Sequence, residues 1–425
     1  MRHCETHVRD GRWVGASALI TLAALVVLAL LSSGCSGSDV TDETDDGVSG
    51  SPSTTAAVDG NEADFTEVAA TMDAGVAQRG LGGAGLVIVE RDDGVVYEHY
   101  SGDFDADRIS LLASSSKMLT AGVLLHLADE GTLDMDAPVA DVVDWGAGNP
   151  DITPAQLLSN SSGLIGLIDD PTFAPYLCQY LATGSLSDCA RQIFTTTADD
   201  DQVVVPDSEF RYGGGQWQVA GAVAEAASGK PWSELIDEIY VEPCQLDSLG
   251  YNNHFGQITS DNGPFSYPTS FGGDPSTLVA TDNPNMEGGA YASARDYSTL
   301  LLMQLRGGVC GDERVLSEAS VRRMQTDRVV ATYRADLAAT LGGVVGAAED
   351  EDTGGGRTLG GYGLGWWIDA DDAAYVEDAG AFGSVPWLDL DRGYGAYLIV
   401  EATAQQGRSL AGELRPLIEQ QIDLG

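Results

Sequence analysis

The pattern of apolar and polar positions predicts strands towards both ends of the chain and helices between them. A helical pattern covers 64–78, and two strand-like stretches, 85–90 and 95–100, lie on either side of the turn residues 92–94; this arrangement predicts a β-hairpin. Strand patterns return in three later stretches, at 363–368, 384–390 and 395–401. A last helical pattern runs from 410 to 421.

The middle of the chain is mainly helical in pattern. Residues 118–128 are apolar nearly all round, which predicts a central, buried helix. Thr153 and Pro154 are typical of a helix cap and a first helical position. Further helical patterns follow at 215–228, 232–240 and 294–305. We therefore expect a mixed α/β (α+β) fold, in which helices flank one antiparallel β-sheet built from both ends of the domain and a mainly helical lobe is inserted at roughly 126–285.

The first 62 residues follow a different pattern. Basic residues come first, at Arg2, Arg9 and Arg12. An apolar run at 13–31 follows them, and small residues then lead to Cys35. This order predicts a lipoprotein signal at 1–35 with Cys35 lipidated. An uncleaved anchor helix stays open as an alternative, because the apolar run nearly spans a bilayer. Residues 36–62 are rich in Ser, Thr, Asp and Gly, which predicts a disordered linker before a domain at 63–424.

Charge and cysteine content limit the binding partners and the cellular compartment expected for this domain. A net charge of −44 argues against nucleic acid and anionic membrane surfaces as partners. The predicted signal places the domain outside the cytoplasm, in the cell envelope. Four cysteines remain in the domain, Cys178, Cys189, Cys244 and Cys310. An even number in an exported protein suggests two disulfides. We prefer Cys178 with Cys189 and Cys244 with Cys310, since the first pair closes a short loop, while other pairings and free thiols stay open.

Candidate chemistry is concentrated at Ser114, three residues before Lys117. The chain has only two lysines, Lys117 and Lys230. Residues three apart lie on one face of a helix, so Ser114 at a helix start would lie close to the Lys117 ammonium. A lysine among apolar groups loses its charge readily, and the neutral amine can take the serine proton. This pattern predicts a lysine-activated serine nucleophile.

Several stretches together resemble one known superfamily. They are 112–120, 124–139, 152–164, 210–221, 228–232, 288–293 and 362–367. With them, the chain resembles the serine β-lactamase and penicillin-binding protein superfamily, nearest the branch of class C β-lactamases, D,D-peptidases and family VIII esterases. The resemblance covers about 63–424. It implies an antiparallel sheet with a helical lobe, and an acyl-enzyme mechanism that needs no cofactor.

The resemblance also implies roles for single residues. Ser114 would be the nucleophile and Lys117 its base or proton relay. Tyr212 would share protons with Lys117 and the leaving group. The backbone amides of Ser114 and Ala381 would form the oxyanion hole. Asn160 stands where a histidine is commoner in a signature segment, and we include it among the substrate-binding candidates.

Two motifs depart from the family pattern. The second is usually Tyr-x-Asn or Tyr-x-Ser, but Gly214 stands in the third place after Tyr212. The third is usually Lys-Thr-Gly or His-x-Gly, and here Asp378 replaces the cation while Gly380 keeps the glycine. Gly214, Asp378 and Gly380 are therefore candidate substrate-binding positions. An aspartate there would repel a substrate carboxylate by a few kcal/mol, so we expect neutral or amine-bearing esters or amides. The alternative that Asp378 points to solvent stays open.

The sequence thus favours an exported serine hydrolase that acts through an acyl-enzyme on a small-molecule or cell-wall-derived ester or amide. A catalytically impaired relative that binds cell-wall fragments or a protein partner is the alternative. We expect no metal, because neither His-Glu-x-x-His nor Cys-x-x-Cys occurs in the chain. Its five scattered histidines offer no obvious Ser/His/Asp triad.

Overall fold

The computed structural model of the chain describes 63–149, 151–167, 172–259, 266–268, 271, 273–329 and 357–424. The predicted signal at 1–35, its lipidation site Cys35 and the linker at 36–62 lie outside these residues. Contacts separate Met1–Val58 from a compact unit, Asp59–Gly425, and everything below concerns the described part of that unit.

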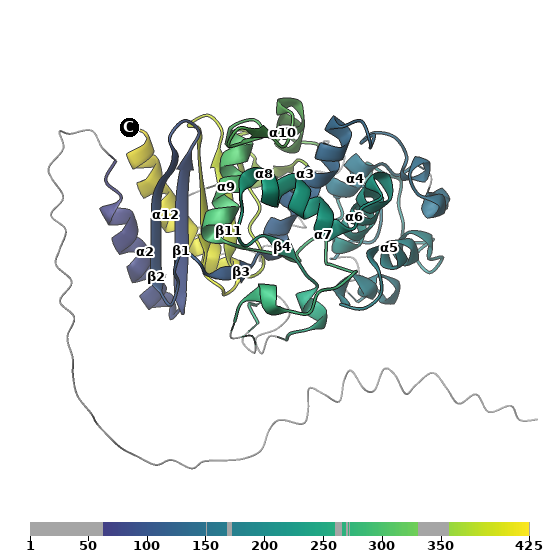
Figure 1. Cartoon of the computed structure of the whole chain (residues 1–425), viewed down its shortest axis with the longest axis horizontal. Helices are drawn as coiled ribbons and strands as arrows, with labels where there is room; N and C mark the ends of the chain where they lie inside the picture. The colour runs from purple at the N-terminus through teal and green to yellow at the C-terminus, as the bar shows by residue number, and fades with distance from the viewer. Residues whose placement is uncertain are drawn as a thin grey trace, which may run out of the picture. The chain divides into compact units, whose positions relative to one another are not determined.

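The centre of the unit is a seven-stranded antiparallel sheet in the order β2-β1-β12-β11-β10-β9-β8 (Figure 1). Its strands are β1 (Gly83–Glu90), β2 (Gly94–Gly102), β8 (Leu359–Tyr362), β9 (Trp367–Asp369), β10 (Tyr375–Glu377), β11 (Ser384–Asp389) and β12 (Tyr394–Ile399). The first strand pairs with the last, from Gly85 opposite Ile399 to Glu90 opposite Tyr394. The sheet is therefore built from both ends of the domain, which confirms the predicted fold class.

Helices cover both faces of this sheet because both faces of its inner strands are apolar. On β1, Leu86 and Ile88 pack with α2 (Thr66–Arg79) and α12 (Ala404–Ile422). Val87 alternates with them and packs on the opposite side, in the core that includes α9 (Ala294–Leu305). This alternation follows from the period of two in a β-strand. Figure 1 shows α2 and α12 on one side of the sheet and α9 on the other.

The helical lobe follows the first strands. Its helices are α3 (Ser116–Asp129), α4 (Pro154–Leu158), α5 (Leu186–Thr195), α6 (Gly214–Ser228), α7 (Trp232–Ile236) and α8 (Glu242–Cys244). Smaller elements are β3 (Ile109–Leu111), β4 (Gly250–Tyr251), β5 (Ala290–Ser293), β6 (Val309–Cys310), β7 (Glu313–Arg314) and α10 (Glu318–Met324). Thr153 caps α4 as predicted, through a reciprocal pair of hydrogen bonds with Gln156. The buried helix predicted at 118–128 is α3, whose side chains are nearly all buried.

Some element boundaries differ from the prediction. The strand expected at 363–368 is wrong in its first half, because a turn separates β8 from β9 there. Gly365 has φ +83° in this turn, and an added Cβ would lie 2.9 Å from the Lys117 backbone. A glycine is thus required where β8 and β9 approach α3. The three-residue strand β10 is too short to give an alternating pattern and was not predicted.

Two disulfides tie the lobe, Cys178–Cys189 and Cys244–Cys310. They have the pairing that the sequence analysis preferred. In the described part of the chain, no helix is both long and apolar enough to cross a bilayer. The predicted anchor segment at 13–31 lies outside that part.

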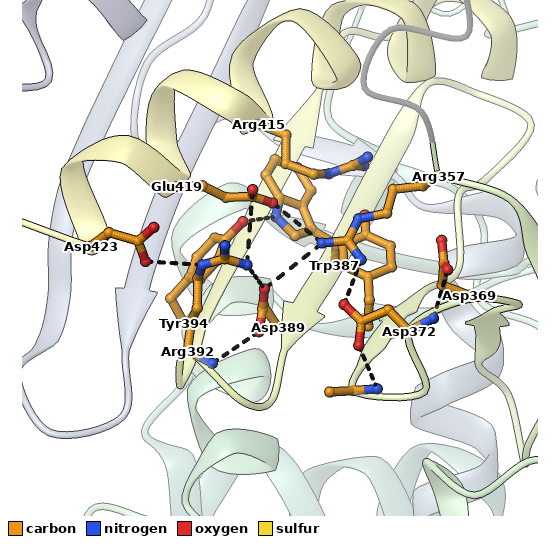
Figure 2. A network of polar contacts seen from close by, with 12 residues as sticks. Arg357, Asp369, Asp372, Trp387, Asp389, Arg392, Tyr394, Arg415, Glu419 and Asp423 are labelled. Carbon is orange, nitrogen blue, oxygen red and sulfur yellow. Dashed lines mark hydrogen bonds and ion pairs between the residues drawn. The ribbon is translucent and has the colours of Figure 1, made fainter.

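The C-terminal helix is held on the sheet by a network of charges (Figure 2). Arg392 donates to Asp389 at 2.7 Å and to Asp423 at 3.0 Å. Arg357 lies 3.5 Å from Glu419 on α12. The nearly buried Arg415 guanidinium lies over the rings of Tyr375 (4.8 Å) and Trp387 (5.2 Å). These contacts fix α12 against the hairpin of β11 and β12.

Candidate active site

Ser114 lies where strand β3 turns into helix α3. The turn is a single 3-10 turn, Ala113–Ser115, directly followed by α3. Ala113 has φ +47°, a conformation that costs alanine free energy and persists only when its surroundings impose it. The Ser116 hydroxyl donates to the Ala113 carbonyl at 2.7 Å, which holds this turn. The strained turn presents Ser114 at the N-terminus of a buried helix, where developing negative charge is stabilised.

The three consecutive serines have different surroundings. The Ser115 hydroxyl is buried and donates to the Asp378 carbonyl at 2.7 Å. Ser116 Oγ is buried and accepts from the Ala290 amide at 3.0 Å. Ser114 is only partly buried, and its Oγ accepts a hydrogen bond from the Tyr212 hydroxyl at 3.0 Å. Ser114 is thus the serine of this run that is both accessible and in contact with a proton carrier.

Tyr212 is fixed on the other side of Ser114. Its ring stacks on Trp367, with 5.5 Å between centroids, and only 3% of the residue is exposed. Burial raises the pKa of the Tyr212 phenol, although the neighbouring Lys117 acts in the opposite direction. The resting phenol is therefore protonated at neutral pH and can donate its hydrogen bond to Ser114.

Lys117 lies over the Tyr212 ring. Its Nζ is 4.6 Å from the ring centroid and donates to the Glu287 carbonyl at 3.1 Å. The side chain is 0% exposed. Burial alone would lower the pKa of this ammonium, but the oxygens of Tyr212, Glu287 and Asp378 outweigh burial and raise it. The expected purely apolar surroundings are not found, because the Glu287 carboxylate and the Tyr212 ring lie beside this lysine. The neutral lysine of the reactive form stays a prediction.

Asp378 follows β10 and is completely buried, with 0% exposed. Neither carboxyl oxygen has a hydrogen-bond partner. Burial raises the pKa of this carboxyl well above its usual range. The alternative that Asp378 points to solvent is thus wrong. Burial thus favours the neutral form of this carboxyl, which weakens the expected charge repulsion of a substrate carboxylate. The third motif still lacks the family's cation.

We predict that Asp378→Asn stabilises the protein more as pH rises. The pKa of Asp378 is higher in the folded than in the unfolded chain, so its favourable contribution is present below about pH 4 and is lost as pH rises towards the folded pKa. Asparagine does not ionise, so the two proteins should have similar stability near pH 4 and differ by about 1 kcal/mol or more near pH 8. Urea unfolding across this range measures the difference. Exposed Asp312→Asn is the control, and an equal effect of Asp378→Asn at both pH values would contradict the prediction.

The glycine of the third motif brings its loop against the serine turn. A Cβ on Gly380 would lie 2.1 Å from the Leu112 carbonyl oxygen, so only glycine fits. The Gly380 amide donates to Ser384 at 2.7 Å, and the bond from Ser115 to the Asp378 carbonyl closes the contact. Ala381 follows and is only partly buried. The oxyanion role of the Ser114 and Ala381 amides stays a prediction.

Asn160 lies in the interior and not on an accessible surface. It is 0% exposed and has φ +55°. Its side-chain oxygen accepts from Gln216 at 2.9 Å and from Trp217 at 3.1 Å, both on α6. Its backbone carbonyl accepts from Arg211 at 2.8 Å, the residue before Tyr212. In this structure Asn160 positions the Tyr212 segment, and direct contact with a substrate stays a prediction.

A small pocket adjoins the second motif. It is lined by Ile165, Gly166, Leu167, Phe173, Tyr176, Leu177, Gln179, Tyr180, Gly213, Gly214 and Gly215. Gly214 begins α6 and forms part of the wall. Within the described residues, no group of three or more His, Cys, Asp or Glu side chains is placed to hold a metal ion.

Glu287 is the site residue that sequence reasoning missed. It lies between Lys117 and Gly214, and it directly precedes the Gly288-Gly289 pair of a segment used for the resemblance. Its position directly before that segment was the available signal, but an acidic residue beside glycines is equally typical of a solvated loop.

The candidate site thus combines a strained serine turn, a tyrosine hydroxyl in contact with the serine and a buried lysine beside the tyrosine. They lie between an antiparallel sheet and a helical lobe, as in serine β-lactamases and penicillin-binding proteins. Comparison agrees: the chain belongs to the Beta-lactamase family, whose model matches residues 68–415. Members of this family are in general serine hydrolases.

Individual relatives are distant. Penicillin-binding protein 4 of Amycolatopsis lactamdurans is 27% identical over 270 residues, which are 57% of this chain and 65% of that protein. The fold is similar to that of simvastatin synthase (LovD) from Aspergillus terreus, with a TM-score of 0.63, 18% identity and 85% of this chain and 98% of that chain covered. EstCE1, a hydrolase with promiscuous acyltransferase activity, gives a TM-score of 0.62 and 20% identity over 83% of this chain and 97% of that chain. At these identities the two structures show the fold alone.

Proposed function

We propose that the protein is an exported serine hydrolase that cleaves an ester or amide through an acyl-enzyme on Ser114. The observation that carries this proposal is the 3.0 Å hydrogen bond between Tyr212 and Ser114 beside the buried Lys117 ammonium. A serine becomes a nucleophile when an adjacent group can accept its proton, and the tyrosine and lysine side chains form such a group.

The reaction divides into two steps. In the reactive form, the pair formed by Tyr212 and Lys117 has lost one proton to solvent. Ser114 Oγ then attacks the substrate carbonyl carbon while its proton passes to this vacant place in the pair. The amides of Ser114 and Ala381 stabilise the resulting oxyanion, and the alcohol or amine leaves with the proton held by the pair. Water then attacks the acyl-enzyme carbonyl, gives its proton to the same pair and releases the acid, which regenerates Ser114.

The charges near the site favour substrates without a carboxylate. The family's third-motif cation is replaced by the buried Asp378, and Lys117 already has an acidic partner in Glu287. A neutral or amine-bearing ester or amide, from a small molecule or the cell wall, fits this site better than a penicillin carboxylate. Two disulfides support an oxidising location outside the cytoplasm, and Cys35 is the proposed point of lipid anchoring.

The purified full-length protein should hydrolyse p-nitrophenyl butyrate with kcat/KM about tenfold or more above that for nitrocefin, because nitrocefin carries a carboxylate and Asp378 stands at the position of the family's cation. Spectrophotometric release of p-nitrophenol and opening of nitrocefin measure the two rates. Faster turnover of nitrocefin would contradict the proposed substrate class.

A binding protein is the second candidate. The buried carboxyl of Asp378 favours it, because neither carboxyl oxygen has a hydrogen-bond partner. A bound ligand or a conformational change could supply the missing partner. Fluorophosphonate labelling separates the two candidates. A phosphonylated Ser114 peptide in mass spectrometry supports the hydrolase. Absence of both ester hydrolysis and labelling would favour the binding protein.

A further inference from the structure

The missing side chain of the second motif leaves a space that other residues occupy. A Cβ on Gly214 would lie 2.0 Å from Gln179 Oε1 and 2.3 Å from Glu287 Oε1. Gly214 is not among the residues with positive φ, so its backbone accepts other residues. The glycine is therefore explained by the two side-chain ends that fill its place, and not by the backbone.

Glu287 holds Lys117 by two different groups. Its backbone carbonyl accepts from Lys117 Nζ at 3.1 Å, and its carboxylate Oε2 lies 3.6 Å from the same nitrogen. The other carboxylate oxygen accepts from the Tyr180 hydroxyl at 3.3 Å. Only 9% of Glu287 is exposed, so water screens this ion pair little.

A buried ammonium requires a partner of opposite charge. Lys117 is fully buried, and an unpaired ammonium in such surroundings would give up its proton. Asp378 is as deeply buried as Lys117, and its oxygens have no hydrogen-bond partner. Glu287 is the carboxylate within ion-pair distance of Lys117, and its polar end also reaches the edge of the pocket at Gly214.

We propose that Glu287 is a positioning residue for the Ser114 reaction, which takes the place left open by Gly214 and keeps Lys117 charged and held against the Tyr212 ring. This inference rests on the proposed function for its consequence in catalysis. Its physical content, a buried ion pair that replaces a motif side chain, can be tested without any substrate.

The chain offers an unusually clear direct test, because Lys117 and Lys230 are its only lysines. In protein labelled with ¹³C at lysine Cε, two signals result, and Lys230→Arg assigns them. In Glu287→Gln the Lys117 signal should titrate at lower pH than in the wild type, because the negative charge that stabilises the ammonium is gone. An unchanged Lys117 titration would overturn the inference, whether or not the protein hydrolyses esters.

Lys230 provides the matched control. It forms an exposed ion pair with Glu238 on the surface of the lobe. Glu238→Gln makes the same chemical change at the other lysine, and it should leave the Lys117 titration and the rate of ester hydrolysis unchanged. A shift of Lys117 in this variant would show that general charge, and not Glu287, determines its state.

The pH dependence of kcat/KM tests the catalytic consequence. Lys117 and Tyr212 titrate as a coupled pair, and the reactive form has lost one proton from the pair. A negative neighbour opposes this loss, so Glu287→Gln should move the rising limb of the profile to lower pH. If the rising limb of the kcat/KM profile stays in place while the Lys117 titration shifts, Glu287 has no role in the Ser114 reaction. If neither the wild type nor any variant hydrolyses esters or reacts with fluorophosphonate at Ser114, the proposed function fails. The Lys117 titration alone then tests whether Glu287 and Lys117 form the ion pair.

A double-mutant cycle tests the shared space. Gly214→Asn should push the Glu287 carboxylate aside and lower kcat/KM by about tenfold in the wild type. In the Glu287→Ala background the same change should cost less, because only one of the two side-chain ends that fill the space, that of Gln179, then remains. Equal losses in both backgrounds would overturn the claim that Glu287 occupies the place of the motif side chain. Thermal unfolding of each variant separates this coupling from general loss of folding.

Discussion

Ser114→Ala should abolish hydrolysis of p-nitrophenyl butyrate, with a fall in kcat of about 10⁴-fold or more. The reason lies in the serine turn: of the three adjacent hydroxyls, those of Ser115 and Ser116 are buried in structural hydrogen bonds, and Ser114 is the one in contact with Tyr212. No neighbouring hydroxyl can replace it. Steady-state release of p-nitrophenol measures the loss.

Exposed Ser233→Ala is the control for this variant and should retain full activity. Thermal unfolding should show that Ser114→Ala is folded, because this partly exposed hydroxyl contributes little to packing. Equal rates in Ser114→Ala and the wild type would contradict an acyl-enzyme on Ser114 and would favour the binding protein.

Tyr212→Phe should lower kcat by about 10²- to 10⁴-fold, the usual contribution of a general acid or base. The variant keeps the stacking on Trp367 but removes the hydroxyl that contacts Ser114 Oγ. Because Lys117 lies against the ring and donates to Glu287, it is not expected to receive the serine proton efficiently without the phenol. Fluorophosphonate labelling of Ser114 should slow in parallel with ester hydrolysis.

Tyr180→Phe is the matched control, since it removes another hydroxyl close to the site, one that donates to Glu287. We expect a change of only a few-fold, because Tyr180 does not contact the nucleophile. A loss in Tyr212→Phe no larger than that in Tyr180→Phe would contradict the role of Tyr212 and assign proton transfer to Lys117 alone.

Local spacing predicted one part of the site, and long-range packing determined the rest. Ser114 and Lys117 are three residues apart at a helix start, so the sequence identified both. Tyr212 lies 98 residues from Ser114, and only the resemblance brought it to the site. Glu287 reaches Lys117 across 170 residues, and no motif pointed to it. The polar neighbours of Lys117 were missed for the same reason, since the sequence does not show which distant residues pack against it.

The sequence predicted part of the fold, as it predicted part of the site. Strands rich in apolar residues, such as those at 85–90 and 384–390, are present as β1 and β11. The stretch at 363–368 combines strand-forming tryptophans with a turn glycine, Gly365, and its apolar residues gave no signal for where the turn lies. The burial of Asp378 also escaped prediction, because a single polar residue at the end of a strand reads equally well as a surface position.

The pairing of β1 with β12 has a consequence for the folding of the newly synthesised protein. Strand β1 emerges from the ribosome early, but its neighbour β12 is made more than three hundred residues later. Until then, the backbone N–H and C=O groups along one edge of β1 have no partner strand. The hairpin of β1 and β2 alone is not a stable unit. The seven-stranded sheet therefore cannot be completed until the last strands have been made. A truncation that removes β12 and α12 should leave β1 unpaired on that side and prevent the sheet from forming.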